Sequence, residues 1–270
     1  MMNMSNLRNG LTIMTFEIRK QILTQNDCYK AGRKIKPSGI VVHSTGANNP
    51  NLCRYVGPDD GVLGKNKYDN HWNRSGLSKC VHAFIGKAAN GKVMIYQTLP
   101  WDHRGWGVGS GTKGSYNNSH IQFEICEDNL TNASYYKQAF DAAAELCAYL
   151  CKEYSIPVSN VVGHYEAHAA GYGNNHGDPR NWQKKHNDSM DAFRKRVSAL
   201  IGGAKVEPPA ENKQDEAESY TTYTVQNGDS LWKIASKLLG SGTNWPQIQK
   251  ANGLKDTMIH PGQKLKIPKG

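Results

Sequence analysis

What the sequence lacks narrows the class of protein it encodes. The chain of 270 residues contains no apolar run of about 18 residues, the length that a membrane-spanning helix needs. Its first residues, MMNMSNLRNGLTIM, lack a basic head followed by an apolar core, so we expect no secretory signal and synthesis in the cytoplasm. The lack of a long apolar run excludes a membrane-spanning helix. Without a secretory signal, we expect the protein to need another means of leaving the cell.

Paired cysteines are also missing. The six cysteines are scattered from Cys28 to Cys151, and no Cys-x-x-Cys motif occurs among them. This excludes a disulfide-dense scaffold, and we expect reduced thiols in a protein made in the cytosol. Cys147 and Cys151 lie four residues apart in an expected helix, which favours a shared buried face over a metal site.

Negative charge is in short supply. Lys and Arg number 33 against 23 Asp and Glu, and the net charge is +10. Residues 220–270 hold seven Lys against two Asp, residues 205–219 hold two Lys against five acidic residues, and the rest of the surplus lies in residues 1–204. Such a surplus predicts attraction to a polyanion, either nucleic acid or an anionic cell envelope. No nucleic-acid-binding motif accompanies the charge, so we expect no nucleic-acid partner.

Composition divides the chain into four segments. Residues 202–220 combine adjacent prolines, clustered charge and no apolar periodicity, which is typical of a linker. Residues 188–200 predict a helix that closes the preceding domain, with an Asp or Ser cap and a Gly-Gly stop. We therefore expect a disordered extension over residues 1–13, a large domain over residues 14–201 and a small domain over residues 221–268.

Strands and helices alternate in the large domain, which predicts an α/β fold with a mixed β-sheet flanked by helices. The Asn90-Gly91 pair between two alternating segments predicts a hairpin. The long helix is amphipathic and has Asn132 or Ser134 available as a cap. The expected elements are strands at residues 39–43, 82–86, 92–97, 120–126 and 160–164 and a helix at residues 131–154.

Two of the ten histidines, His43 and His164, stand at the ends of apolar strands. The Gly- and Asn-rich stretch at residues 165–182 predicts a loop that folds back over the strand ends and carries His176 and Asp178. Two imidazoles and one carboxylate would make a three-ligand zinc site with an open fourth position, the arrangement of catalytic zinc. Spacing alone leaves this open, because a His-rich chain offers many such triples.

The strand at residues 120–126 alternates strictly, so Glu124 faces away from Ile121 and Phe123. If those apolar side chains pack under helices, the Glu124 carboxylate points into a cleft; otherwise Glu124 is a solvated edge residue. Most other histidines are expected at the surface or in loops, with His168 as a competing ligand: His71, His103, His120, His168, His186 and His260.

Five motifs follow one another between residues 39 and 182. They are Val-Val-His43-Ser-Thr, Val-His82-Ala-Phe-Ile-Gly with Tyr-Gln-Thr-Leu-Pro-Trp-Asp-His-Arg-Gly-Trp106 after it, Gln-Phe-Glu124-Ile, Val-Val-Gly-His164 and His176-Gly-Asp178-Pro. In this order they resemble the zinc-dependent N-acetylmuramoyl-L-alanine amidases of the peptidoglycan-recognition-protein-like fold. Within that family the chain is most similar to the endolysins and autolysins of Gram-positive bacteria, their phages and prophages.

The resemblance implies a role for each of these residues. His43, His164 and Asp178 would hold one Zn²⁺, Glu124 would be the catalytic glutamate, and His176 would stabilise the oxyanion. The implied reaction is hydrolysis of the amide bond between the lactyl carbonyl of N-acetylmuramic acid and L-alanine of the stem peptide.

The family pattern also includes two candidate substrate contacts, His82 and Trp106. Hydrogen bonding within the sheet is the simpler role for His82, and tryptophans fill cores as often as they line grooves. Many relatives carry an aromatic residue at the position of Val81 and a histidine at that of Gly107, which leaves the stem-peptide preference open.

The small domain has the periodicity strand, helix, helix, strand, which predicts a βααβ unit. Its segments Tyr-Thr-Val-Gln-Asn-Gly-Asp229-Ser230-Leu-Trp, Asn-Trp-Pro-Gln-Ile-Gln-Lys-Ala-Asn252-Gly and Ile259-His-Pro-Gly-Gln resemble a LysM module. The resemblance implies binding of glycans that contain N-acetylglucosamine through Asp229, Ser230, Asn252 and Ile259. The apolar residues are expected to form the core: Leu231, Trp232, Ile234, Ala235, Ile248, Leu265 and Ile267.

The leading hypothesis is a modular peptidoglycan hydrolase that its LysM module targets to the wall. The alternative is a non-catalytic peptidoglycan-binding protein of the same fold, against which the full set of ligands and Glu124 argues. By the resemblance to endolysins, the protein would reach the wall after lysis or through a holin-type membrane-permeabilising partner. A wall that bears teichoic acid would then be the polyanion that the positive charge requires.

Overall fold

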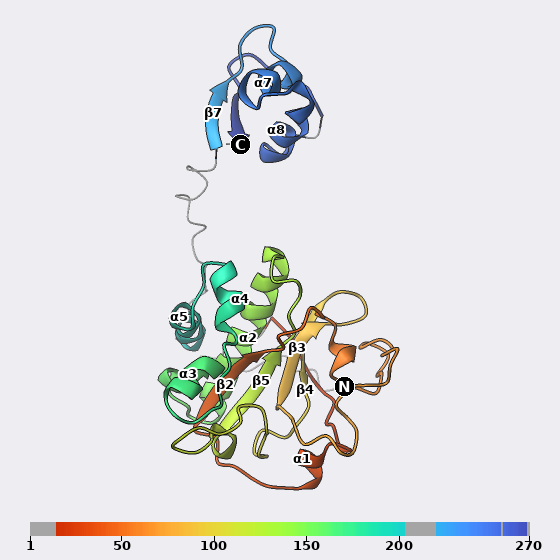
Figure 1. Ribbon diagram of the computed structural model, residues 1–270, viewed down its shortest axis with the longest axis vertical. Helices are drawn as coiled ribbons and strands as arrows, with labels where there is room; N and C mark the ends of the chain where they lie inside the picture. Colours follow the sequence, from red (N-terminus) through yellow and green to blue (C-terminus); the bar gives the residue numbers. More distant parts are fainter. Residues whose placement is uncertain (1–14, 203–219, 255, 269–270) are drawn as a thin grey trace. The chain divides into compact units, whose positions relative to one another are not determined.

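The computed structural model describes residues 15–202, 220–254 and 256–268 (Figure 1). The chain divides into two compact units, the larger within residues 1–206 and the smaller within residues 207–270. The expected extension at residues 1–13 lies outside the described residues, as does the expected linker at residues 202–220 apart from its first and last residue. Each unit has its own hydrophobic core.

A six-stranded sheet organises the larger unit. Its strands are β1 (Ile18–Lys20), β2 (Gly39–Ser44), β3 (Ala83–Lys87), β4 (Val93–Gln97), β5 (His120–Ile125) and β6 (Val161–Gly163). They lie in the order β1-β4-β3-β5-β2-β6. β2 is parallel to β5 and β6, whereas β3 is parallel to β5 and forms an antiparallel hairpin with β4. The mixed sheet and the hairpin expected from the sequence are confirmed.

Helices complete the larger unit (Figure 1): α1 (Asp27–Lys30), α2 (Ala133–Glu153), α3 (His164–Ala169), α4 (Arg180–Lys185) and α5 (Met190–Ile201). The Asn132 side chain accepts the Tyr135 N–H at 3.0 Å and begins α2. Ser189 begins α5 in the same way, through the Ala192 N–H at 3.2 Å. These caps satisfy N–H groups that have no partner inside the helix, which is why both helices begin near the expected positions.

The alternation along the strands gives the two faces of the sheet different roles. Ile121, Phe123 and Ile125 of β5 are fully buried in the cluster that also contains the apolar side of α2. Burial of each such side chain contributes roughly 2 kcal/mol to stability. Glu124 points to the opposite face, and the register sets it beside His43 of β2. The chemistry-bearing side chains therefore share the face of the sheet that lies away from α2.

The end of β6 differs from the expectation. β6 stops at Gly163, and His164 is the first residue of α3 rather than the last residue of a strand. The Gly163 N–H donates to the Glu166 carboxylate at 2.9 Å, and Arg194 of α5 holds that carboxylate at 2.8 Å. The stretch at residues 165–182 therefore contains α3 and the start of α4. The expectation of a continuous loop is wrong because a contact from a distant helix stabilises the first of these turns.

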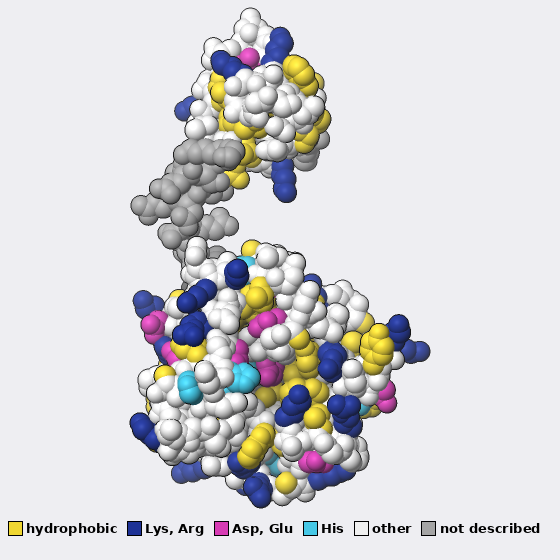
Figure 2. Space-filling model, in the orientation of Figure 1, with side chains coloured by type: hydrophobic (Ala, Val, Ile, Leu, Met, Phe, Trp, Pro, Cys, Tyr) yellow, Lys and Arg dark blue, Asp and Glu magenta, His cyan; other side chains and the backbone are white. Residues whose placement is uncertain are grey.

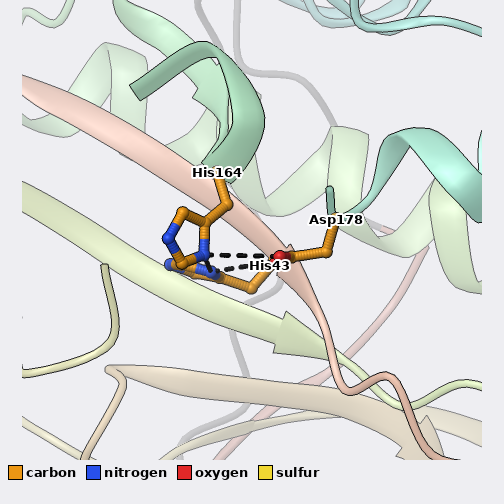
Figure 3. A group of neighbouring side chains, drawn as sticks. All are labelled: His43, His164 and Asp178. Atoms are coloured by element: carbon orange, nitrogen blue, oxygen red, sulfur yellow. Dashed lines mark hydrogen bonds and ion pairs between the residues drawn. The ribbon is translucent and has the colours of Figure 1, made fainter. Parts of the chain in front are cut away.

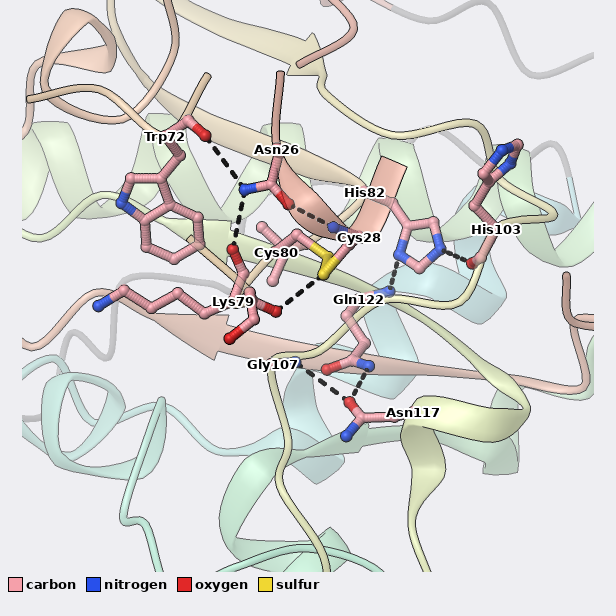
Figure 4. The surroundings of a disulfide bond; sticks show 12 residues. Asn26, Cys28, Trp72, Lys79, Cys80, His82, His103, Gly107, Asn117 and Gln122 are labelled. Carbon is pink, nitrogen blue, oxygen red and sulfur yellow. Dashed lines mark hydrogen bonds between the residues drawn. A yellow bond between two sulfur atoms is a disulfide. The ribbon is translucent and has the colours of Figure 1, made fainter. Parts of the chain in front are cut away.

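Two cysteines are joined, so the expectation that all six are reduced is wrong. Cys28 of α1 and Cys80 form a disulfide, with their Cα atoms 6.4 Å apart (Figure 4). The sequence could not show this pairing, because 52 residues separate the two positions and only the fold brings them together. Cys147 and Cys151 are free and buried on one face of α2, as expected.

The smaller unit has the expected order of elements: β7 (Tyr220–Thr224), α7 (Leu231–Leu238), the short 3₁₀ turn η4 (Gly242–Asn244), α8 (Trp245–Ala251) and β8 (Lys264–Pro268). β7 and β8 pair antiparallel. Its core contains the expected residues except one: Leu231, Ile234, Ala235, Ile248, Leu265 and Ile267.

The exception in the smaller unit is Trp232, which is 56% exposed. The residues of α7 that face the core are Leu231, Ile234 and Ala235, and Trp232 lies outside that face. Its ring lies over Gly242, where a Cβ atom would come within 2.1 Å of the ring. Across both units, no helix in the described ranges has the length and apolar character to cross a membrane.

Candidate metal centre and active site

Three side chains from different elements converge at one point (Figure 3). His43 comes from the end of β2, His164 from the first turn of α3, and Asp178 from the segment before α4. One ligand atom of each lies within 4.8 Å of the others. His43 Nδ1 is 3.1 Å from Asp178 Oδ2, and His164 Nδ1 is 3.0 Å from His43 Nδ1 and 3.4 Å from Asp178 Oδ1. The structure thus brings together the three residues that the resemblance singles out as ligands.

The chemistry of this donor set fits a divalent cation. The two Nδ1 atoms face one another, and His43 and His164 are only 2% and 3% exposed. Two neutral nitrogen lone pairs at this separation repel each other unless a proton or a cation lies between them. Two imidazole nitrogens and one carboxylate oxygen are the ligands that zinc takes in catalytic sites with one open position.

Asp178 is ionised in this setting. Burial alone would raise the pKa of its carboxyl, but the neighbouring imidazoles of His164 and His43 outweigh that effect and hold the pKa far below its usual range. A carboxylate that stays deprotonated is ready to bind a cation without first releasing a proton.

The outer nitrogens of both imidazoles face amide oxygens. His43 Nε2 lies 3.1 Å from Gln122 Oε1, and His164 Nε2 lies 2.9 Å from Asn174 Oδ1. Such contacts orient metal-binding imidazoles in many proteins. The sequence analysis missed both supporting residues, although the alternation of β5 already placed Gln122 on the same face as Glu124.

Glu124 lies next to this cluster. It is the register partner of His43, and its Oε2 atom is buried without a hydrogen-bond partner among the described residues. Burial raises the pKa of the Glu124 carboxyl well above its ordinary value, and the charges of Asp178 and Glu127 raise it further. A carboxylate tuned in this direction is suited to accept a proton near neutral pH.

His176 stands at the outer side of the cluster. Its side chain is 58% exposed, its Nδ1 is 3.8 Å from Asp178 Oδ1, and its ring stacks on that of His164 with centroids 4.8 Å apart. Figure 2 shows histidine and acidic side chains gathered on one face of the larger unit, with hydrophobic side chains beside them. His176 is therefore accessible to a molecule that approaches the cluster from solvent.

A further carboxylate escaped the sequence analysis. Glu127 follows β5, is buried, and accepts a hydrogen bond from the Ser44 hydroxyl. Burial raises the pKa of Glu127, against the opposing effect of that hydrogen bond, and the charge of Asp178 adds to the rise. Nothing in the motif around Glu127 distinguishes it from a solvated loop residue, so only the fold reveals its position.

The two further substrate contacts expected in the larger unit lie in different surroundings. His82 is fully buried; its Nε2 donates to the His103 carbonyl at 2.8 Å and its Nδ1 accepts the Gln122 N–H at 3.0 Å. Burial lowers the pKa of His82 to about 4, so the ring is neutral. Trp106 is 42% exposed, and the Arg104 guanidinium lies 4.6 Å from its ring centroid. His82 thus supports the sheet, whereas Trp106 presents an open aromatic surface.

Two histidines expected at the surface or in loops are buried. His120 stacks on Tyr116 with ring centroids 3.8 Å apart, and burial lowers the pKa of His120 to about 4. His103 is also buried and lies against Tyr29. The expectation is wrong for His120, which is a buried residue of β5 covered by Tyr116, whereas His103 lies in the loop that follows β4. His168, the competing ligand, is exposed and lies outside the cluster of His43, His164 and Asp178.

The four expected glycan contacts of the smaller unit take part in its own structure. The Asp229 carboxylate accepts the Tyr223 hydroxyl at 2.9 Å, and Ser230 caps α7. The Asn252 side chain donates to the Lys266 carbonyl at 2.8 Å and accepts the Lys266 N–H at 2.7 Å. Ile259 packs against the core. These side chains fix the turn and the loop on which a ligand would rest.

Comparison with known families agrees with the fold. Residues 33–181, more than half of the chain, match the family model described as N-acetylmuramoyl-L-alanine amidase, and residues 223–268 match the LysM domain. The chain therefore belongs to the N-acetylmuramoyl-L-alanine amidase family and carries a C-terminal LysM domain.

Individual relatives match parts of the chain. The N-acetylmuramoyl-L-alanine amidase XlyA of Bacillus subtilis is 32% identical over 172 residues, which are 63% of this chain and 46% of XlyA. An N-acetylmuramoyl-L-alanine amidase of Staphylococcus epidermidis is 55% identical over 49 residues, which are 18% of this chain and 14% of that protein. The chain thus spans less than half the length of these relatives. The solved structure of PlyL is similar with a TM-score of 0.49 and 23% identity, over 67% of this chain and 97% of that one.

Proposed function

We propose that this protein is a zinc-dependent peptidoglycan hydrolase that cleaves the amide bond between the lactyl group of N-acetylmuramic acid and L-alanine of the stem peptide. The observation that carries the proposal is the convergence of His43, His164 and Asp178 beside the unpartnered carboxylate oxygen of Glu124. Membership of the amidase family supports the same reaction.

The three converging residues would hold the zinc ion. When bound, Zn²⁺ polarises a carbonyl oxygen and lowers the pKa of a water molecule towards about 7. Glu124 accepts the proton of the attacking water and passes it to the leaving amine of L-alanine. Its raised pKa suits both transfers, because a carboxyl that binds a proton more readily is a better base and still releases the proton to an amine.

His176 would act on the developing negative charge. Its exposed ring at the outer side of the cluster is placed to donate a hydrogen bond to the carbonyl oxygen as that oxygen becomes an oxyanion. A single donor of this kind contributes about 3 kcal/mol to transition-state stabilisation. Trp106 offers an exposed apolar surface for the stem peptide or sugar in the same unit.

The LysM domain would keep the enzyme on its substrate. Asp229, Ser230, Asn252 and Ile259 fix the turn and the loop that would bind glycans containing N-acetylglucosamine. Tethering a binding module to a catalytic one raises the local concentration of enzyme at the wall without new contacts at the active site. The positive charge would add attraction to teichoic acid, and a holin-type partner or cell lysis would give access to the wall.

Digestion of purified cell wall tests the proposal. We expect new amino-terminal L-alanine without new reducing sugars, loss of this product with a chelator, and its return with Zn²⁺. New reducing ends would show a glycosidase instead. Binding to the wall without any product would favour the non-catalytic alternative.

A further inference from the structure

A chain of two side-chain amides connects the backbone of one loop to His43. It runs from residues 107–109 to the Asn117 side chain and on to the Gln122 side chain (Figure 4), and it ends at the His43 imidazole. Both amide side chains are fully buried, so water does not compete for their hydrogen bonds. In a buried site every hydrogen-bond donor must face an acceptor. The orientation of the first amide in the series therefore determines the orientation of the next.

The backbone sets the orientation of Asn117. Its Oδ1 accepts the N–H groups of Gly107 at 3.1 Å and Val108 at 3.2 Å, and its Nδ2 donates to the Gly109 carbonyl at 3.0 Å. A backbone N–H only donates and a carbonyl only accepts, so the Asn117 amide cannot be turned around without losing all three bonds. The oxygen of Asn117 is therefore fixed as an acceptor.

The hydrogen bond to Asn117 fixes the orientation of the Gln122 side chain. Its Nε2 donates to Asn117 Oδ1 at 2.8 Å, which leaves Oε1 to face His43 Nε2 at 3.1 Å. The main chain of Gln122 is held as well, because its N–H donates to His82 Nδ1 at 3.0 Å and its carbonyl accepts the His82 N–H at 2.7 Å. Because Gln122 Oε1 can only accept a hydrogen bond, a hydrogen bond to it requires a proton on His43 Nε2.

We propose that Gln122 is a positioning residue that holds the proton of neutral His43 on Nε2 and so leaves Nδ1 free as the metal-binding atom. The relevance to zinc rests on the proposed function. Asp178 Oδ2, 3.1 Å from Nδ1, competes for the same proton, and Gln122 Oε1, 3.1 Å from Nε2, is the acceptor that holds it on the far side of the ring. The orientation is set by the backbone of residues 107–109, which fixes Asn117 and through it Gln122.

The space around Gln122 is matched to this role. A Cβ atom at Gly107 would lie 2.7 Å from Gln122 Oε1 and 3.0 Å from the Val81 side chain. Any side chain at position 107 would therefore push the Gln122 oxygen away from His43. The absence of a side chain at Gly107 is part of what keeps the amide in contact with the imidazole.

The direct test is the protonation pattern of His43 in metal-free protein. Long-range ¹H–¹⁵N NMR, recorded at a pH where the ring is neutral, distinguishes a proton on Nε2 from one on Nδ1. We expect the proton on Nε2 in the native protein. In Gln122→Met the acceptor is lost, and we expect the proton to move to Nδ1, where Asp178 accepts it. Gln122→Glu keeps an acceptor towards His43 and should restore the native pattern.

Metal affinity gives a second readout that does not depend on activity. Competition with a chelator should show that Gln122→Met raises the zinc Kd about 10- to 100-fold, the usual effect of losing a residue that orients a ligand. Gln138→Met, on the exposed side of α2, is the matched control and should bind zinc as the native protein does.

The proposal is overturned if native His43 carries its proton on Nδ1, a result that requires no variant. It is also overturned if Gln122→Met leaves both the ring protonation and the zinc Kd unchanged. Failure of the wall digestion with a proton found on Nε2 would overturn the proposed function while leaving the role of Gln122 in place.

Discussion

His43 and His164 meet at one point but are held by different parts of the larger unit. The support of His43 is the buried Gln122 of the central strand β5, which Asn117 and the backbone orient in turn. The support of His164 is Asn174, an exposed residue between α3 and α4, in the same segment that carries His176 and Asp178. One half of the site is thus built into the sheet, and the other half is carried by a surface segment.

The two halves of the site have different roles, which are precise positioning and contact with the substrate. A strand in the middle of a sheet holds a side chain precisely because its backbone has neighbours on both sides, whereas a surface segment can present groups to a substrate. The sheet half contains His43, Gln122 and Glu124, and the segment half contains Asp178 and His176. We expect changes in the sheet half to have the larger effects.

The largest effect is expected for Glu124→Gln, which removes the proton acceptor but keeps the shape of the side chain. The turnover number should fall by about 10²- to 10⁴-fold, the usual contribution of general acid–base catalysis. The zinc content should stay the same, because Glu124 is not one of the converging ligands. Steady-state kinetics on wall fragments and metal analysis of the same sample check both points, and a loss of zinc would contradict the role given to Glu124.

His176→Ala tests the segment half. Loss of one oxyanion donor should lower the turnover number by about 10²- to 10³-fold. Zinc binding should be nearly unchanged, since His176 is exposed and stands 3.8 Å from Asp178. His168→Ala, an exposed position in α3, serves as the control and should keep full activity. Equal activity of the two variants would remove His176 from the mechanism.

Stability should depend on pH through His120, the first residue of β5. Burial lowers the pKa of His120 to about 4 in the folded protein, against an ordinary value of 6.5. The folded state then takes up its proton less readily than the unfolded state, so stability from this residue is complete above pH 6.5 and is lost as the pH falls towards 4. The loss amounts to about 3 kcal/mol by linkage.

Urea unfolding at pH 7 and pH 4.5 measures this loss. In His120→Gln the dependence on pH should be weaker than in the native protein, whereas His168→Gln, which changes an exposed histidine, should leave it as it is. Parallel curves for native protein and His120→Gln would show that His120 does not stay neutral in the fold.

The smallest effect is expected for Asn174→Ala, the counterpart of Gln122→Met. Because Asn174 is exposed, water can take the place of its amide oxygen beside His164 Nε2. The zinc Kd should rise less than about tenfold, and less than it does in Gln122→Met measured in the same chelator competition. A larger effect for Asn174→Ala would reverse the comparison between the two halves of the site.

The sheet half was also the more predictable one. The alternation of β5 showed from sequence alone that Glu124 and Gln122 share a face, because a period of two residues is a local property. The role of Gln122 could not be predicted from the sequence. It depends on the hydrogen bond from Gln122 to Asn117 and on the close approach of Gly107, and neither contact follows from the alternation of β5.

Elsewhere the sequence failed where a distant contact decides the structure. Arg194 and Glu166 turn the residues after Gly163 into a helix, and no local pattern announced this. The disulfide between Cys28 and Cys80 joins positions that only the fold brings together. Trp232 is a further case, because we expected it in the core and its ring instead lies over Gly242.

The central claim is that His43, His164 and Asp178 bind zinc through the Nδ1 atoms of both imidazoles. Titration of metal-free protein with Zn²⁺, followed by long-range ¹H–¹⁵N NMR of the histidine rings, tests it most directly. The account predicts that the Nδ1 signals of His43 and His164 shift together and are complete at one equivalent, while those of His82 and His168 stay in place. A shift that is larger at Nε2 than at Nδ1 of either ligand, or one at His168 instead of His164, would contradict it.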